Sequence, residues 1–165
     1  MSNMVYLLCS LPSLTFGQEP PVSFDEFHRD SQEQLSSKHF KILKEADLRG
    51  INSAAKGKLK NISVLNDKLQ RDLMEIRNTK AEKRHPNLAY LPKAVSELNP
   101  LEREKQILQW QWKELDDMEA GSTFSLINVL VYKLKLQILI RMNSFNQEQG
   151  SKVLASIING EQRMN

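Results

Sequence analysis

The residues best suited to metal chemistry are Asp25 and His28, three positions apart on a predicted helix. This spacing places both side chains on one helix face, as in half of a carboxylate-bridged dimetal site. The other half would need a second pair of the same kind, but the residue three positions before His39 is Ser36. The third histidine is His85. The pattern therefore predicts no metal site.

A catalytic nucleophile is equally hard to find. The single cysteine, Cys9, lies in an apolar run without a basic neighbour, which predicts a buried and unreactive thiol. The sequence contains no phosphate-binding glycine loop, nucleophile elbow or zinc-binding HExxH pattern. We therefore expect a protein that is not an enzyme and that uses no cofactor or small-molecule substrate. A set of acids in one predicted helix is typical of a solvated face: Glu104, Glu114, Asp116, Asp117 and Glu119.

The charge of the chain is concentrated in one segment. The net charge is +3, but residues 41–84 carry 12 basic and 6 acidic side chains, against 2 and 5 in residues 1–40. Nucleic acid is disfavoured as a partner, because acids alternate with these basic residues and no aromatic ring is interleaved. The residues expected to contact an acidic protein partner are Lys68, Arg71, Arg77, Lys80, Lys83 and Arg84.

Two tryptophans suggest a further contact point. Trp110 and Trp112 are two positions apart on a predicted helix, so their indoles cannot both point straight into one core. Trp112 suits the core. We expect at least one indole at an edge or interface, where tryptophan often anchors a partner, and Trp110 is the candidate.

Local capping signals predict two helices. Ser23 and the acid three positions later form a capping box before a helix over residues 24–34. Asn99 caps a helix over residues 100–119, with Pro100 at the first helical position, where a missing N–H costs nothing.

Apolar spacing predicts the remaining elements. Residues 51–84 carry an apolar residue every three or four positions, which predicts one long amphipathic helix. Residues 124–143 are apolar on nearly all sides, which predicts a central, mostly buried helix. Only Lys133, Gln137 and Arg141 form a polar strip on it. The other expected elements are a strand or a helical turn within 4–14, a helix over 37–47, a surface connection over 85–98, and a last helix started by a capping box at 146–149.

These elements predict an all-α helical bundle. We expect a single domain over residues 1–165, with parts at 1–50, 51–84 and 99–160. No run reaches the roughly 18–20 apolar residues that span a bilayer. The apolar run near the N-terminus is also too short for a signal peptide. We therefore expect a cytoplasmic protein.

Three parts of the sequence carry a family resemblance. They are YLLCSLPSL at 6–14 followed by PPVSFDEF at 20–27, NPLERE at 99–104 leading to Trp110, and residues 124–139 ending in YKLKLQIL. Together they resemble a bacterial family of uncharacterised proteins similar to the C subunit of V-type (archaeal-type) ATPases. The genes of that family lie among those of such ATPases. Residues 71–77 are a weaker match to the family's long arginine-bearing helix.

The resemblance implies an all-helical, noncatalytic subunit or accessory protein of a V-type ATPase. Such a protein couples or assembles the central shaft with the proteolipid ring in the membrane. Its partners would be the other ATPase subunits, and it would be peripheral at the inner membrane only through the complex. The alternative is a free-standing helical adaptor or assembly factor for other protein partners.

Overall fold

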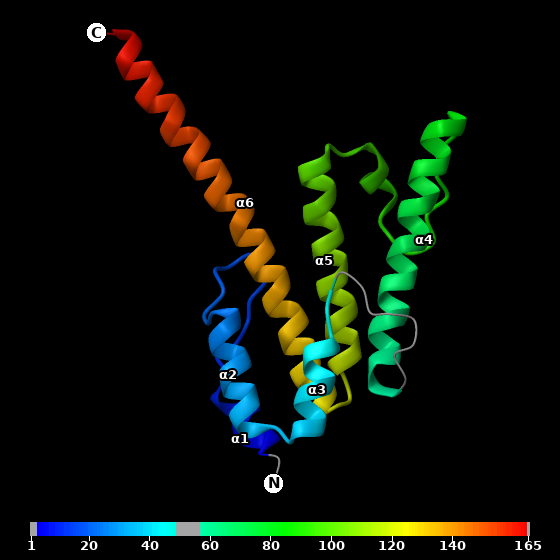
Figure 1. The fold of residues 1–165 in the computed structure, drawn as a ribbon. Helices are drawn as coiled ribbons and strands as arrows, with labels where there is room; N and C mark the ends of the chain where they lie inside the picture. Colours follow the sequence, from blue (N-terminus) through cyan, green and yellow to red (C-terminus); the bar gives the residue numbers. More distant parts are fainter. Residues whose placement is uncertain (1–2, 49–56, 165) are drawn as a thin grey trace.

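The computed structural model describes residues 3–48 and 57–164, and this part of the chain is all-α, without a strand. The fold class predicted from the sequence is therefore confirmed. Figure 1 shows α5 beside α6, the short helices α1 to α3 against α6, and α4 at the outer edge beyond α5. The α-helices are α1 (Met4–Ser10), α2 (Phe24–Gln34), α3 (Ser37–Glu45), α4 (Lys60–Glu82), α5 (Pro100–Glu119) and α6 (Leu126–Met164). Short 3-10 helices cover Gly57–Leu59 and Lys93–Glu97.

The first half of α6 is the centre of the body. Its side chains at Leu130, Leu134, Ile138 and Leu139 are fully buried, as are several between them. A helix that is apolar on most sides must be covered by neighbours, and here α1, α2, α3 and α5 cover it (Figure 1). This confirms the prediction of a central, mostly buried helix for residues 124–143, although the helix begins at Leu126.

The helices with local capping signals begin where the sequence predicts. The Ser23 Oγ accepts a hydrogen bond from the Glu26 N–H at 3.1 Å, and α2 spans 24–34 as expected. The Asn99 Oδ1 accepts one from the Glu102 N–H at 2.9 Å, and α5 has the predicted bounds. Each cap satisfies an N–H group that has no partner inside its own helix.

The structure settles which element lies within residues 4–14 and corrects the end of the helix predicted over residues 37–47. The open choice within residues 4–14 is settled in favour of the helix α1. The helix predicted over 37–47 ends at Glu45, because Ala46 adopts an extended backbone and is fully buried. That extended turn carries residues 47 and 48 away from α3 and toward α6.

The long amphipathic helix is shorter than predicted. Helix α4 begins at Lys60 after a turn of 3-10 helix, and the first positions of the predicted stripe, at 51–56, lie outside the described residues. It ends at Glu82, because Lys83 adopts a left-handed conformation with φ of 56°. Its buried side chains confirm the rest of the stripe: Ile62, Leu65, Leu69 and Ile76.

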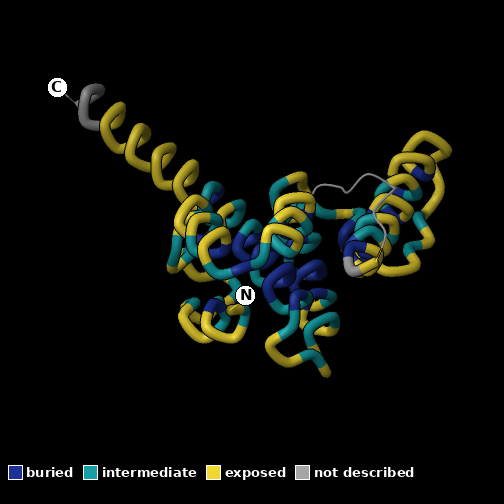
Figure 2. Tube along the Cα trace, turned by 60° about the horizontal axis from the view of Figure 1, so that its bottom comes forward, coloured by how far each residue is buried: buried dark blue, intermediate teal, exposed yellow. Residues whose placement is uncertain are grey.

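The predicted break between the last two helices is wrong. Residues 146–149 form no cap, and α6 runs without interruption from Leu126 to Met164. Residues 146–160 are all exposed (Figure 2). Asparagine and glutamine tolerate a helix interior, so a capping pattern without a flanking turn residue does not force a helix to stop. The chain thus has a projecting helix in place of a separate one packed on the body.

Candidate functional site

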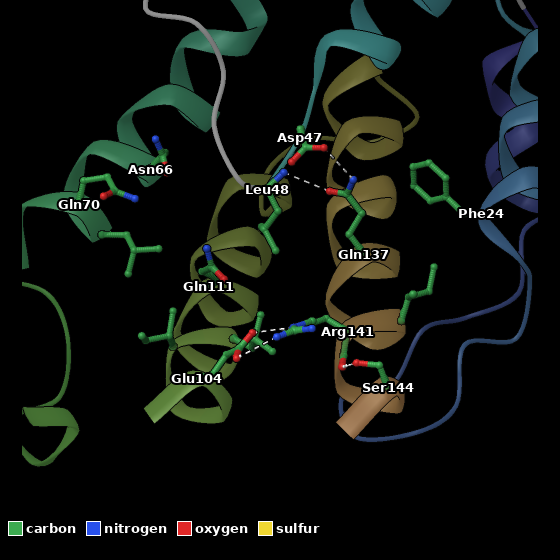
Figure 3. A pocket seen from close by; sticks show the side chains of 14 residues that line it. Phe24, Asp47, Leu48, Asn66, Gln70, Glu104, Gln111, Gln137, Arg141 and Ser144 are labelled. Carbon is green, nitrogen blue, oxygen red and sulfur yellow. Dashed lines mark hydrogen bonds and ion pairs between the residues drawn. The ribbon is translucent and has the colours of Figure 1, made fainter. Parts of the chain in front are cut away.

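A groove of about 890 Å³ lies between α4, α5, α6 and the residues that follow α3. Leu69 of α4, Leu108 of α5 and Ile140 of α6 form part of its apolar lining. Its polar lining consists of four amide side chains, the Glu104–Arg141 ion pair, Asp47 and Ser144, and Figure 3 shows these groups around the same space. The amides belong to Asn66, Gln70, Gln111 and Gln137.

Most polar groups of the groove are already engaged. The Gln137 Oε1 accepts a hydrogen bond from the Leu48 N–H at 3.1 Å, and its Nε2 donates to Asp47 at 3.4 Å. Arg141 donates two hydrogen bonds to the Glu104 carboxylate, at 2.7 and 3.1 Å. These bonds raise the pKa of Arg141 above its ordinary value. The groove therefore has a fixed shape on the α5–α6 side.

Gln111 is one of three amides in the groove, with Asn66 and Gln70, whose side chains make no hydrogen bond among the described residues. Its side chain is 3% exposed and lines the groove, yet it has no hydrogen-bond partner among the described residues. Its amide atoms are not among the fully buried side-chain atoms that lack a partner, so they face the open groove. An occupant of the groove can form a hydrogen bond with this amide. The groove can thus hold a chain segment or helix that is mainly apolar and carries uncharged polar groups.

The six cations predicted to bind a partner fall into two groups. Arg77, Lys80 and Lys83 are exposed and make no ion pair within the described residues. The side chains of the other three contact groups of the same chain. Arg84 pairs with Glu75 and Glu82, Lys68 lies 3.6 Å from Glu114, and the Arg71 guanidinium lies 5.9 Å from the ring centre of Tyr90. We call Arg77, Lys80 and Lys83 the cationic row.

Trp112 lies in the core, as predicted, but the expectation of an indole at an exposed edge is wrong. Trp110 and Trp112 are both buried, so neither indole stands at an exposed edge. Trp112 packs edge-on against Phe16, with ring centres 5.5 Å apart. The Lys135 ammonium lies 5.1 Å from the centre of a Trp112 ring. The loop that carries Phe16 covers a side of α5 that helical spacing alone leaves open. Trp110 therefore offers a partner little surface in this conformation.

The candidate catalytic and metal-binding residues are not brought together. Within residues 3–48 and 57–164, no group of three or more His, Cys, Asp and Glu side chains could hold a metal ion. Cys9 is exposed, so the prediction of a buried thiol is wrong. One face of the short helix α1 is covered by the body, and Cys9 lies on the other. His28 lies against Phe24, with ring centres 4.5 Å apart, and its Nε2 is buried without a partner.

The environment of His28 predicts a pH-dependent stability. Burial lowers the pKa of His28 below its ordinary 6.5; the charges of Lys133 and Lys44 act in the same direction, and that of Asp25 opposes them. The unfolded chain then binds more protons than the native protein just below pH 6.5, so stability falls as the pH falls through that value. Thermal unfolding between pH 7.5 and 5 checks this.

The variant His28→Leu isolates the contribution of this side chain. It is expected to flatten the decline in melting temperature toward pH 5, because the titrating group is gone. The exposed His85 supplies the matched control, and His85→Gln should leave the decline unchanged. An identical pH profile in wild type and His28→Leu would contradict the assignment.

One buried carboxylate, which no sequence motif marks, holds the segment after α4. Asp72 is 1% exposed and accepts hydrogen bonds from three consecutive backbone N–H groups, those of Ala89, Tyr90 and Leu91, at 3.1, 2.8 and 2.7 Å. The predicted surface connection at 85–98 is therefore partly internal, with Leu91 and Val95 buried. This arrangement fixes the returning chain against α4.

These features define an all-α protein with a groove beside its central helix and a cationic outer helix. The chain belongs to the DUF2764 family, described as a protein of unknown function, whose match covers residues 56–163. No curated protein and no solved structure gives a significant match to the chain. Among the described residues, no helix has both the length and the apolar character needed to cross a membrane.

Proposed function

We propose that this protein is a noncatalytic subunit or accessory protein of a V-type ATPase, similar to the C subunit of such enzymes. The support is the resemblance carried by residues 6–14, 20–27, 99–110 and 124–139, together with an all-helical body that fits it. In this role the protein couples or assembles the central shaft with the proteolipid ring. It works in the cytoplasm and is peripheral at the inner membrane only through the complex.

The observation that carries the proposal is the cationic row at the end of α4. Arg77 and Lys80 lie on this outermost helix and Lys83 directly follows it, and all three are free of internal ion pairs within the described residues (Figure 1). Charges placed in this way steer a partner of opposite sign and fix its orientation. The partner they suit is an acidic surface of a neighbouring ATPase protein. Nucleic acid and small molecules are not expected to bind.

Co-purification from the native cells tests the proposal. A tagged chain is expected to recover the shaft and ring proteins of the ATPase at low ionic strength. The triple variant Arg77→Glu, Lys80→Glu, Lys83→Glu is expected to recover about tenfold less, because like charges then face each other. The control reverses three exposed lysines elsewhere: Lys38, Lys41 and Lys113.

Each result has a clear meaning. Equal recovery by both triple variants would exclude the cationic row as the contact, while recovery of the ATPase by wild type would still support the assembly. Recovery of no ATPase protein by the wild-type chain would refute the proposal. Reproducible recovery of a different set of proteins would favour the alternative.

That alternative, a free-standing helical adaptor or assembly factor, is favoured by the groove. An amphipathic helix docks by placing an apolar ridge in such a groove. The unpartnered amide of Gln111 gives the groove a polar group that a bound helix would satisfy. If partners unrelated to the ATPase are recovered and Gln111→Leu changes their recovery, the adaptor function is the better description.

A further inference from the structure

The end of α6 extends beyond the body and has an apolar stripe with nothing against it. Figures 1 and 2 show this part of the helix leaving the other elements, with an exposed surface all round. Its four large aliphatic side chains are about half exposed, and neighbouring exposed apolar side chains often mark an interaction site. The exposed fractions are 58% for Val153, 59% for Leu154, 54% for Ile157 and 46% for Ile158.

The four side chains lie on one face. Positions separated by three or four residues are neighbours on a helix, so Val153, Leu154, Ile157 and Ile158 make a stripe about two turns long. The opposite face is polar and includes Asn159. An apolar stripe with a polar opposite face is the pattern of a helix that packs on one partner surface. Among the described residues, no segment of the same chain supplies that surface.

We propose that the stripe binds the same stripe of a second copy of this chain, with the two helices antiparallel. The four positions are symmetric about a point between residues 155 and 156. A two-fold axis through that point brings Val153 of each copy against Ile158 of the other, and Leu154 against Ile157. The interface is self-complementary, as a two-fold dimer requires.

The antiparallel direction follows because, nearer the body, other elements cover the side of α6 that carries the stripe. Eighteen residues make five turns of α-helix, so residues 18 positions apart point to the same side. Leu154 therefore lies on the same side as Leu136, and Gly150 lies on the same side as Tyr132. On that side Tyr132 stacks on Phe27 of α2 and donates a hydrogen bond to the Pro12 carbonyl. A parallel partner would bring a second body against this covered side.

An antiparallel partner avoids this collision. The symmetry point lies about ten residues beyond Phe145, which is the last buried side chain of α6. At 1.5 Å of rise per residue, the two bodies are then separated by roughly 30 Å along the helix pair. The projecting helices can therefore meet along the stripe without contact between the bodies.

The short length of the stripe predicts a weak dimer. Stable complexes bury about 1,200–2,000 Å² in total, and two helical turns from each chain bury less than that. We therefore expect a reversible dimer that is mainly monomeric near 1 µM and mainly dimeric at several hundred micromolar. The expectation is independent of a role in the ATPase, because it concerns the isolated full-length chain.

Sedimentation equilibrium on the full-length protein tests the association. Ile157→Glu is expected to weaken the dimer at least tenfold, because it places a charge at the centre of the seam. Asn159→Glu, on the opposite face of the same turns, is the matched control and should leave the dimer unchanged. A wild-type chain that stays monomeric at several hundred micromolar, or a dimer unaffected by Ile157→Glu, would overturn the proposal.

Cysteine pairing tests the direction of the helices. In a Cys9→Ser background, Leu154→Cys mixed with Ile157→Cys should form a disulfide between the two variants much faster than either variant forms one alone. The parallel arrangement predicts the reverse, because each cysteine would then face its own copy. Faster crosslinking of the single variants would exclude the antiparallel dimer. Circular dichroism confirms that each variant keeps its helices.

Discussion

Replacing Asp72 with alanine is expected to lower the free energy of unfolding by about 3 kcal/mol. The carboxylate accepts three backbone hydrogen bonds from residues 89–91, and its removal leaves three buried or half-buried N–H groups without a partner. Each such group costs about 1–3 kcal/mol when its partner is lost, and local relaxation recovers part of the total. Urea or thermal denaturation, followed by circular dichroism, measures the change.

The control for this variant is Asp67→Ala, an exposed acid on the same helix with no ion pair among the described residues. It is expected to change stability by less than about 0.5 kcal/mol. Amide hydrogen exchange adds a local readout, because the N–H groups of Ala89 to Leu91 should lose protection in Asp72→Ala. Unchanged protection at those three amides would show that Asp72 does not hold the segment.

The elements predicted correctly are those with local signals. Asn99 and Ser23 cap helices by bonding N–H groups three positions away, so the relevant chemistry is contained in four consecutive residues. The central part of α6 is equally predictable, because apolar residues on most sides of a helix require cover. In both cases the determinant lies within one element.

The failures have a different cause. The residues at 146–149 resemble a cap, but α6 continues through them because no turn residue or competing contact stops it. The expectations of a buried Cys9 and of an indole at an exposed edge are wrong, because exposure depends on which neighbour covers each helix face. That information is in the tertiary arrangement, which spacing along one helix does not contain.

The groove could not be predicted from the sequence for a related reason. Its lining comes from α4, α5, α6 and the segment after α3, and one of its hydrogen bonds joins Gln137 to Leu48, which are 89 residues apart. The only sign of it is the polar strip on an otherwise apolar helix. Each member of that strip forms a hydrogen bond with a neighbouring element. Lys133 bonds to the end of α3, Gln137 bonds to residues 47–48, and Arg141 bonds to helix α5.

Among the three residues of the polar strip, Lys133 is the one whose substitution is expected to lower stability most. Its side chain is 2% exposed, and its Nζ donates hydrogen bonds to the carbonyls of Leu43 at 2.7 Å and Lys44 at 3.4 Å. These carbonyls belong to the last turn of α3, where few helical N–H groups remain to bond them. The Leu43 carbonyl also accepts a hydrogen bond from the Ala46 N–H at 3.3 Å. The ammonium group thus caps α3 and ties it to the central helix.

Lys133→Met should lower the free energy of unfolding by about 2 kcal/mol at pH 7. The loss of a hydrogen bond from a charged donor costs about 1.5–3 kcal/mol, and relief from burying a charge offsets part of it. The exposed Lys41→Met is the control and should have little effect. A variant as stable as wild type would show that the cap adds no net stability.

The pH dependence separates the cap from simple packing. Burial lowers the pKa of Lys133 below 10.5, so between the lowered pKa and 10.5 the unfolded chain binds more protons. Stability attributable to Lys133 therefore rises with pH in that window, and the deficit of Lys133→Met should grow from pH 7 to 10. Burial also raises the pKa of Tyr132 to about 12, but this contribution is common to both proteins and cancels in their difference. A deficit that stays constant with pH would contradict the lowered pKa of Lys133 and hence the burial of its ammonium group against α3.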